Sequence, residues 1–226
     1  MDGGAIYILA QQPGSEISGN YIKNQQNVFG AIYPDNGSDS YAINNNITEN
    51  VWMSLFISTA DKKNLTGSNN WTTNSVMQNY GTNCNIDSLK YYVPGNMPAA
   101  AQAIADNAGL TKEYSAVKDR VNVIPHEYTD AEKYFNVVNG QTSISDGNFI
   151  YHYLRNVIDG AKTILQTAQS GAYAQEKLNA LSQACDAADT KYNKFKSSVD
   201  SGKAIDRNAV LEAKSGIENA VNVFLN

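Results

Sequence analysis

Short apolar phrases recur along residues 1–96 at a nearly constant period. Gly4-Ala5-Ile6-Tyr7 returns 26 residues later as Gly30-Ala31-Ile32-Tyr33, and Ser54-Leu55-Phe56-Ile57 echoes it after another 24. The phrases are β-branched or aromatic, and Gly, Pro, Asn, Asp and Ser separate them, which is typical of short strands joined by turns. A phrase that returns in step indicates one structural unit stacked on itself. The pattern therefore predicts a β-solenoid, a parallel β-helix of about three to four coils.

Stacked coils place equivalent side chains in columns. Alternate residues of a strand point inward and lie on their equivalents in the next coil. We expect two interior columns, Ile6–Ile32–Phe56 and Ile22–Ile47–Trp71, and an asparagine ladder of Asn20, Asn45 and Asn69. Amide side chains can hydrogen-bond from coil to coil, and Asn tolerates left-handed corners. We interpret the ladder as structural.

The pattern changes after residue 96. A short helix beginning near Ala99 is predicted, and it would cover the open end of the solenoid. Apolar residues at helical spacing then predict three helices, the second from Leu178 to Val199 and the third capped by Asp206. The predicted organisation is a β-helix with its cap over residues 1–120, a connector over 121–145 and an up-down-up three-helix bundle over 146–226.

Composition excludes some classes of partner. The net charge is −5 and no arginine precedes Arg120, which argues against a nucleic-acid partner. No apolar run is long enough for a membrane span. Two histidines and two cysteines, Cys84 and Cys185, show no metal-binding spacing, so we expect no metal or cofactor and two free thiols.

The first predicted strand follows Met1 almost directly. A coil that began there would leave its apolar stack uncovered. We therefore expect upstream β-helix coils of a longer parent chain, or a partner chain, to cover the N-terminal coil.

Several segments resemble a known group of enzymes. Asp2 to Leu9, Gln12 to Ile22, Gly30 to Ser38 and Ala103 to Leu110 look like right-handed parallel β-helix carbohydrate enzymes of gut bacteria, most of all the β-helix lacto-N-biosidases. Residues 146–226 resemble three-helix modules of Gram-positive surface proteins. The resemblance implies an extracellular or cell-surface bacterial glycoside hydrolase. It also implies two catalytic aspartates close in sequence; no such pair can be placed here, and one or both can lie upstream of this chain.

Candidate catalytic residues come from the mechanism of glycoside hydrolysis. Two carboxyl groups must flank the scissile bond, about 5–5.5 Å apart for retention and about 6.5–9.5 Å for inversion. Asp2 and Asp35 stand just before and just after the repeated strands, so they are the candidate catalytic pair. The alternative readings are a solvated terminal residue for Asp2 and an ordinary turn at Asp35.

Candidate substrate-binding residues lie beside this pair. Tyr7 and Tyr33 occupy equivalent positions of the repeat and would form an aromatic wall for a sugar ring. Gln11 and Asp39 lie in the adjoining turns and could bind hydroxyl groups. A purely structural tyrosine ladder and ordinary loop residues are the alternatives.

Three functions remain open from the sequence. The first is the C-terminal portion of an extracellular glycoside hydrolase acting on oligosaccharides by a two-carboxylate mechanism. The second is a non-catalytic carbohydrate-binding or adhesive surface β-solenoid. The third is a polysaccharide lyase, which the arginine-free coil region disfavours.

Overall fold

The computed structural model describes residues 3–25, 29–74, 76–114, 116, 145–169, 171 and 173–226. Its strands are β1 (Ile6–Ile8), β2 (Glu16–Ser18), β3 (Tyr21–Lys23), β4 (Ile32–Pro34), β5 (Ala42–Asn44), β6 (Ile47–Glu49), β7 (Leu55–Ile57), β8 (Thr66–Ser68), β9 (Trp71–Thr72), β10 (Met77–Asn79), β11 (Asn85–Ile86) and β12 (Lys90–Tyr91). Its helices are α1 (Ala99–Asn107), α3 (Asp146–Ile150), α4 (Asn156–Ala168), α5 (Gln175–Asp200) and α6 (Arg207–Leu225), with a π-helical turn η2 (Tyr151–Arg155) between α3 and α4. The predicted connector of residues 121–145 lies outside the described residues except for Ser145.

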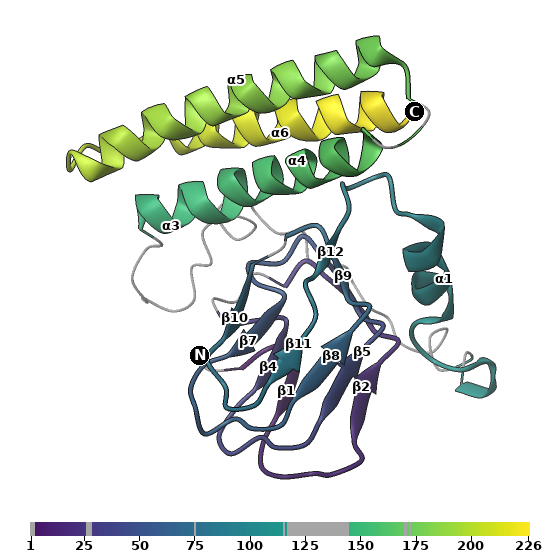
Figure 1. Ribbon diagram of the computed structural model, residues 1–226. Coiled ribbons are helices and arrows are strands. Elements are labelled where there is room, and N and C mark those ends of the chain that lie inside the picture. Colours follow the sequence, from purple (N-terminus) through teal and green to yellow (C-terminus); the bar gives the residue numbers. More distant parts are fainter. Residues whose placement is uncertain are drawn as a thin grey trace.

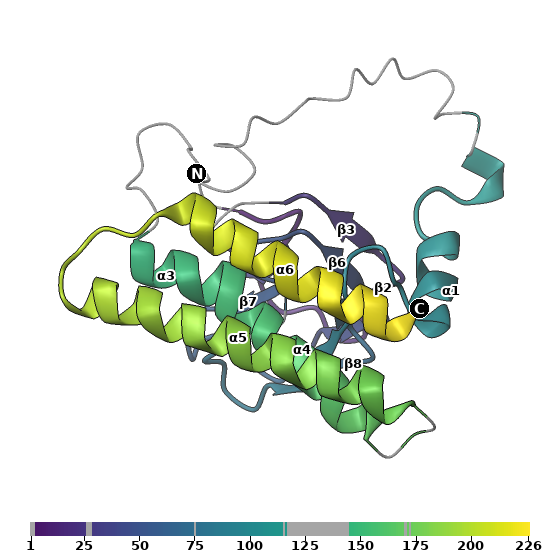
Figure 2. The same cartoon turned by 90° about the horizontal axis from the view of Figure 1, so that it is seen from above.

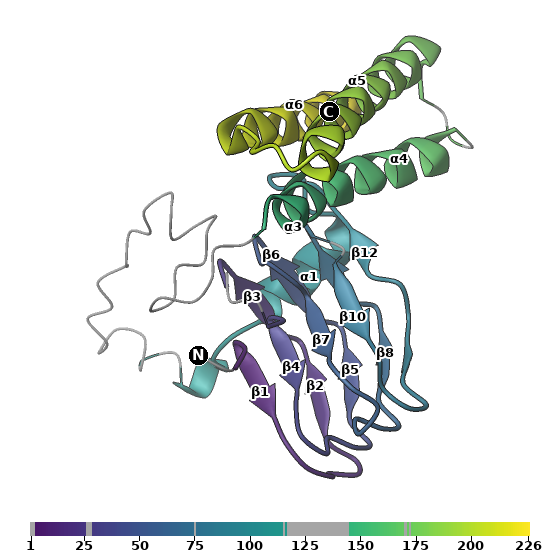
Figure 3. The same cartoon turned by 90° about the vertical axis from the view of Figure 1, so that its left-hand side faces the viewer.

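Strands that lie one repeat apart pair with each other. Within the described residues, three four-stranded sheets form in the orders β1-β4-β7-β10, β2-β5-β8-β11 and β3-β6-β9-β12, so the chain visits the sheets in the same order in every repeat (Figure 1). The strand pairs are parallel, and Figure 3 shows the repeats lying side by side along one axis. Mixed β and α structure of this kind is consistent with the predicted solenoid followed by helices, and we call one repeat of three strands a coil.

The interior column of the first sheet differs from the expectation by one residue. Ile6 aligns with Ile32 as predicted, but Ile32 aligns with Leu55 rather than with Phe56. Successive side chains of a strand point to opposite faces, so a shift of one residue moves a side chain from the core to the outside. Leu55 therefore lies in the coil interior, and Phe56 joins Tyr33 on the outer face.

The third sheet shows the same shift. Ile22 aligns with Thr48, not with Ile47, and Tyr21 aligns with Ile47, which in turn aligns with Trp71. Ile22 lies in the coil core, whereas Ile47, Tyr21 and Trp71 pack together in a separate cluster on the other face of the sheet. The expected column is therefore wrong at Ile22, whereas the alignment of Ile47 with Trp71 is confirmed.

The predicted asparagine ladder is two ladders. Asn20 donates from Nδ2 to Oδ1 of Asn46 at 2.9 Å, and Asn46 donates to Oδ1 of Asn70 at 3.1 Å, the second of these contacts being buried. Asn45 and Asn69 form an exposed contact of 2.7 Å, and both have the left-handed φ, 54° and 52°, that favours Asn at corners. Stacked amides therefore hold the coils together inside and outside the wall.

Helix α1 covers a side wall of the coils rather than their end. Ala101 is fully buried and packs with Ile47 of β6 and with Tyr92, which directly follows β12, so the helix contacts different repeats of the third sheet. Figure 3 shows α1 behind the middle of the stack. The helix was predicted correctly, but its position over the open end was not.

The C-terminal helices form the predicted bundle. Helices α4, α5 and α6 lie side by side above the strands, as Figure 2 shows from the helix side. Asp206 caps α6 as predicted, accepting hydrogen bonds from the backbone N–H groups of Asn208 and Ala209. Cys185 lies buried in this bundle, and Cys84 lies in the coils; both are free thiols, as expected.

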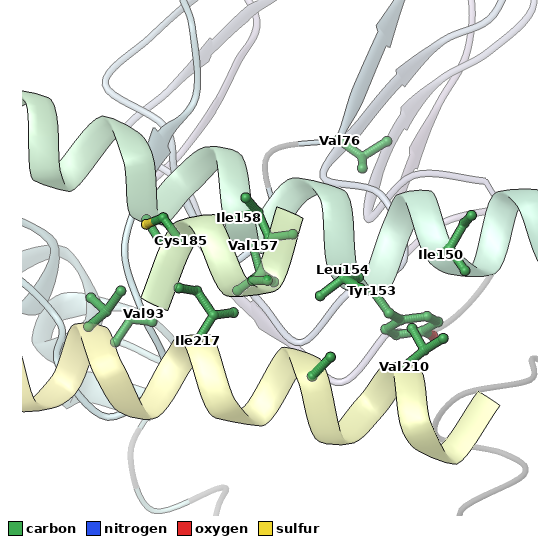
Figure 4. Close-up of a cluster of buried hydrophobic side chains, with 14 of the residues drawn as sticks. Val76, Val93, Ile150, Tyr153, Leu154, Val157, Ile158, Cys185, Val210 and Ile217 are labelled. Carbon is green, nitrogen blue, oxygen red and sulfur yellow. The ribbon is translucent and has the colours of Figure 1, made fainter. Parts of the chain in front are cut away.

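Coils and bundle share one hydrophobic core. Trp52, Met53, Val76 and Val93 from the coils belong to the same buried cluster as the apolar faces of the helices, and Figure 4 shows Val93 near Ile217 of α6. The π-helical turn brings His152 onto this junction, where its ring stacks on Trp52 with centroids 3.6 Å apart. The bundle is thus packed onto the coils.

Candidate functional site

The outer face of the first sheet carries a row of aromatic side chains. Tyr7 and Tyr33 align in register on β1 and β4, as predicted, and their ring centroids are 5.3 Å apart. Phe56 continues the row at 5.0 Å from Tyr33, and Phe29 stacks on Tyr33 at 5.4 Å. Tyr7 is 41% exposed, whereas Tyr33 is buried beneath its neighbours. The row therefore presents Tyr7 as its accessible ring.

Asp35 follows β4 and ends this row. Its side chain is buried, and the Tyr7 hydroxyl donates to its Oδ2 at 2.5 Å. Burial would raise the pKa of Asp35, but hydrogen bonds from Tyr7, Tyr33 and the backbone N–H of Asn36, together with the charge of Lys62, lower that pKa below its ordinary value. Asp35 is therefore an ionised carboxylate held between two tyrosines and a lysine.

Lys62, from the next repeat, compensates the charge of Asp35. Its Nζ lies 3.5 Å from Oδ1 of Asp35 and 2.9 Å from Oδ1 of Asp61, and its side chain is 2% exposed. The Asp61 side chain is 48% exposed, and hydrogen bonds from Thr59, Lys62 and the Gly37 backbone lower its pKa. One buried ammonium group thus lies between two ionised carboxylates of adjacent repeats.

Gln11 and Asp39 form a second group of polar side chains, more exposed than Asp35, at the next corner. They pair in a parallel bridge, and the carboxylate of Asp39 accepts hydrogen bonds from Ser40 at 2.7 Å and from Asn64 at 2.9 Å. These two hydrogen bonds lower the pKa of Asp39. Between this corner and β4, the backbone N–H of Ser38 donates to the carbonyl of Asp35, so the segment is the tight turn that its Asn and Gly residues favour.

The structure brings together some of the predicted residues. Tyr7, Tyr33 and Asp35 form one connected group, and Gln11 and Asp39 form another. Asp2 lies outside the described residues, so the catalytic pair of Asp2 and Asp35 stays a prediction. Lys62 and Asp61 were not singled out from the sequence, and the only available signal was that the repeat places them at the corner facing Asp35.

The electrostatics of the site indicate which chemistry it supports. Among the described carboxyl groups with a clear pKa shift, every shift is downward; these groups are Asp35, Asp39, Glu49, Asp61 and Asp189. An ionised carboxylate can accept hydrogen bonds or act as a base or nucleophile, whereas a general acid needs a raised pKa. The described residues therefore suit binding better than proton donation.

Comparisons of the chain with protein-family models, with curated proteins and with solved structures found no match. In the part of the chain that the structure describes, no helix has the length and hydrophobicity required to cross a membrane. Over the same residues, no three His, Cys, Asp or Glu side chains are grouped so as to hold a metal ion.

Proposed function

We propose that this chain is the oligosaccharide-binding part of an extracellular bacterial glycoside hydrolase, and that its coils form a right-handed parallel β-helix. The observation that carries the proposal is the aromatic row of the first sheet, which ends at an ionised carboxylate. Tyr7 offers an exposed ring, and Asp35 fixes its hydroxyl. Sugar rings have apolar C–H faces and hydroxyl edges, so an aromatic face next to fixed polar groups suits them.

Two further features support this proposal. The parallel stacking of strands along one axis is the arrangement that the resemblance to β-helix carbohydrate enzymes requires. The ion pair of Asp35 and Lys62 is buried, and the Tyr7 hydroxyl donates to Asp35, so the polar groups beside Tyr7 are held in one geometry before any ligand arrives. Binding groups held in place in advance lose less entropy when the ligand binds.

Hydrolysis by the described residues is the second candidate. Asp35 and Asp61 lie on either side of Lys62, so two carboxylates of adjacent repeats come close to one point. Their lowered pKa values suit a nucleophile or base, and the acid would have to be another group, for which Asp2 stays the prediction. A lyase would need a cation to neutralise a uronate, but two carboxylates already neutralise Lys62.

The test is a glycan-array screen and a hydrolysis assay with the full chain. We expect Tyr7→Ala to weaken binding of a captured glycan at least about tenfold, equivalent to about 1.4 kcal/mol. Tyr114→Ala is the matched control, since Tyr114 is an exposed tyrosine beyond the coils and should leave binding unchanged.

Asp35→Asn separates the two candidates. If the coils only bind, this variant has no turnover to lose; if they hydrolyse, turnover should fall by orders of magnitude. A screen in which no glycan binds, or in which both tyrosine variants behave like the unmodified chain, would refute the assignment of the aromatic row.

A further inference from the structure

A cleft lies where the coils meet the helices. Its volume is about 310 Å³, at the lower end of the range for small-molecule sites. The coils contribute Lys23, Glu49 and Asn74 to its walls, and the helices contribute His152, Lys214 and Glu218. None of these residues belongs to the aromatic row or to the Asp35 cluster.

The coil wall of this cleft holds an ionised carboxylate. Glu49 ends β6, and its carboxylate accepts hydrogen bonds from Lys23 at 2.6 Å, from the Tyr21 hydroxyl at 2.8 Å and from the Tyr92 hydroxyl at 2.9 Å. Burial would raise the pKa of Glu49, but these partners lower it. The Lys23 side chain is 52% exposed, so its remaining N–H groups can reach a ligand.

The helix wall supplies a second ion pair and a hydrogen-bond acceptor. Lys214 and Glu218 pair at 2.7 Å on α6, and both side chains are largely buried. Nδ1 of His152 lies 2.9 Å from the carbonyl oxygen of Trp52. A carbonyl only accepts, so Nδ1 carries the proton and Nε2 is an acceptor.

The same junction contains polar atoms whose hydrogen-bonding needs are not met. Over the described residues, the buried side-chain atoms without a partner are Oε1 of Gln25, the Tyr91 hydroxyl and Oδ1 of Asn222. Gln25 follows Asn24, which lines the cleft. Asn222 lies one turn after Glu218 on α6. Burial and the negative charge of Glu218 raise the pKa of Tyr91. Buried polar atoms are almost always paired in proteins, so these three mark polar positions within the otherwise apolar junction around the cleft; none of the three residues lines the cleft itself.

We infer that this cleft binds a neutral, hydroxyl-rich ligand, namely one sugar ring of a glycan, between the coils and the helices. Its charged residues balance, with Lys23 and Lys214 against Glu49 and Glu218. A phosphate would require an excess of cations and a metal ion an excess of carboxylates. Each sugar hydroxyl both donates and accepts, which matches a wall of mixed amides, ammonium groups and carboxylates. The inference takes its ligand class from the proposed function but uses a separate set of residues.

Titration of the full chain with glucose, galactose and N-acetylglucosamine, followed by NMR, tests this inference. We expect shifts of the side-chain amide signals of Asn24 and Asn74 with at least one of the three sugars. Glu218→Gln should weaken that binding at least about tenfold, while Glu212→Gln, an exposed glutamate on the same helix, should leave it unchanged. Inorganic phosphate and Ca²⁺ should cause no such shifts.

Tyr7→Ala distinguishes a failure here from a failure of the proposed function. This variant should lose binding at the aromatic row and keep binding in the cleft. Circular dichroism of Glu218→Gln should show an unchanged fold; if Glu218→Gln unfolds the helices, Lys23→Met on the exposed side of the cleft takes its place in the comparison. Phosphate binding tighter than sugar binding, no shift with any of the three sugars, or equal affinities of the cleft variant and the control would each overturn the inference.

Discussion

Acidification should loosen the junction between coils and helices through His152. The His152 ring is 8% exposed, stacks on Trp52 at an interplanar angle of 10° and contacts the Trp52 carbonyl through Nδ1. Burial lowers its pKa from 6.5 to about 4. Between these two pH values the unfolded chain binds a proton that the folded chain does not, so stability falls as the pH falls.

The magnitude follows from the size of this shift. Each pKa unit corresponds to about 1.4 kcal/mol, so full protonation would cost about 3 kcal/mol. Between pH 7 and pH 5 the same linkage predicts a loss of about 2 kcal/mol. The carboxylates with lowered pKa values stay ionised over this interval, so His152 dominates the pH dependence among the shifted groups.

Denaturant unfolding followed by tryptophan fluorescence measures this loss, because Trp52 contacts the titrating ring. The matched variant is His152→Phe, which keeps an aromatic ring beside Trp52 and cannot be protonated. Its free energy of unfolding should change by about 2 kcal/mol less than that of the unmodified chain between pH 7 and pH 5. A His126→Gln background leaves one histidine, so its NMR titration reports His152 alone. An imidazole that titrates near pH 6.5, or equal pH dependence of the two chains, would refute the reasoning.

Three further substitutions test the helix packing and the buried ion pair. Gly160→Ala would place a Cβ 2.5 Å from the Tyr91 ring and should destabilise the chain by about 1–3 kcal/mol. Gly216→Ala has open space around it in α6 and should be neutral or stabilise the chain by about 0.5–1 kcal/mol. Thermal unfolding of both variants measures the difference. Lys62→Met would leave Asp35 buried without its cation and should cost about 3–5 kcal/mol in denaturant unfolding. A Lys62 variant as stable as the unmodified chain would show that the ion pair is dispensable.

The repeat in the sequence predicted the stacking of strands but not its register. The phrase Gly-Ala-Ile-Tyr placed Ile6 opposite Ile32 and Tyr7 opposite Tyr33 correctly, since both copies are identical. The runs of consecutive asparagines offered two alignments, and the structure pairs Asn20 with Asn46 instead of Asn45. Where a repeat unit changes length by one residue, periodicity alone cannot say on which side of the corner the extra residue lies.

The candidate site shows the same division. The position of Asp35 beside the tyrosines could be predicted because Asp35 follows Tyr33 by two residues and the repeat aligns Tyr33 with Tyr7. Lys62 comes from another repeat and Glu218 from a distant helix, so their roles depend on three-dimensional packing that no local pattern encodes. The side-wall position of α1 could not be predicted either, since it depends on the outward-facing Ile47 and hence on the register.

The buried cluster that joins the strands to the helices has a consequence for dissection of the protein. The helices cover part of the cluster formed by Trp52, Met53, Val76 and Val93 (Figure 4). Truncation of the chain near residue 145 would therefore expose a contiguous hydrophobic surface on the N-terminal fragment. Such a fragment should aggregate in water, and the intact polypeptide should unfold thermally in one cooperative transition.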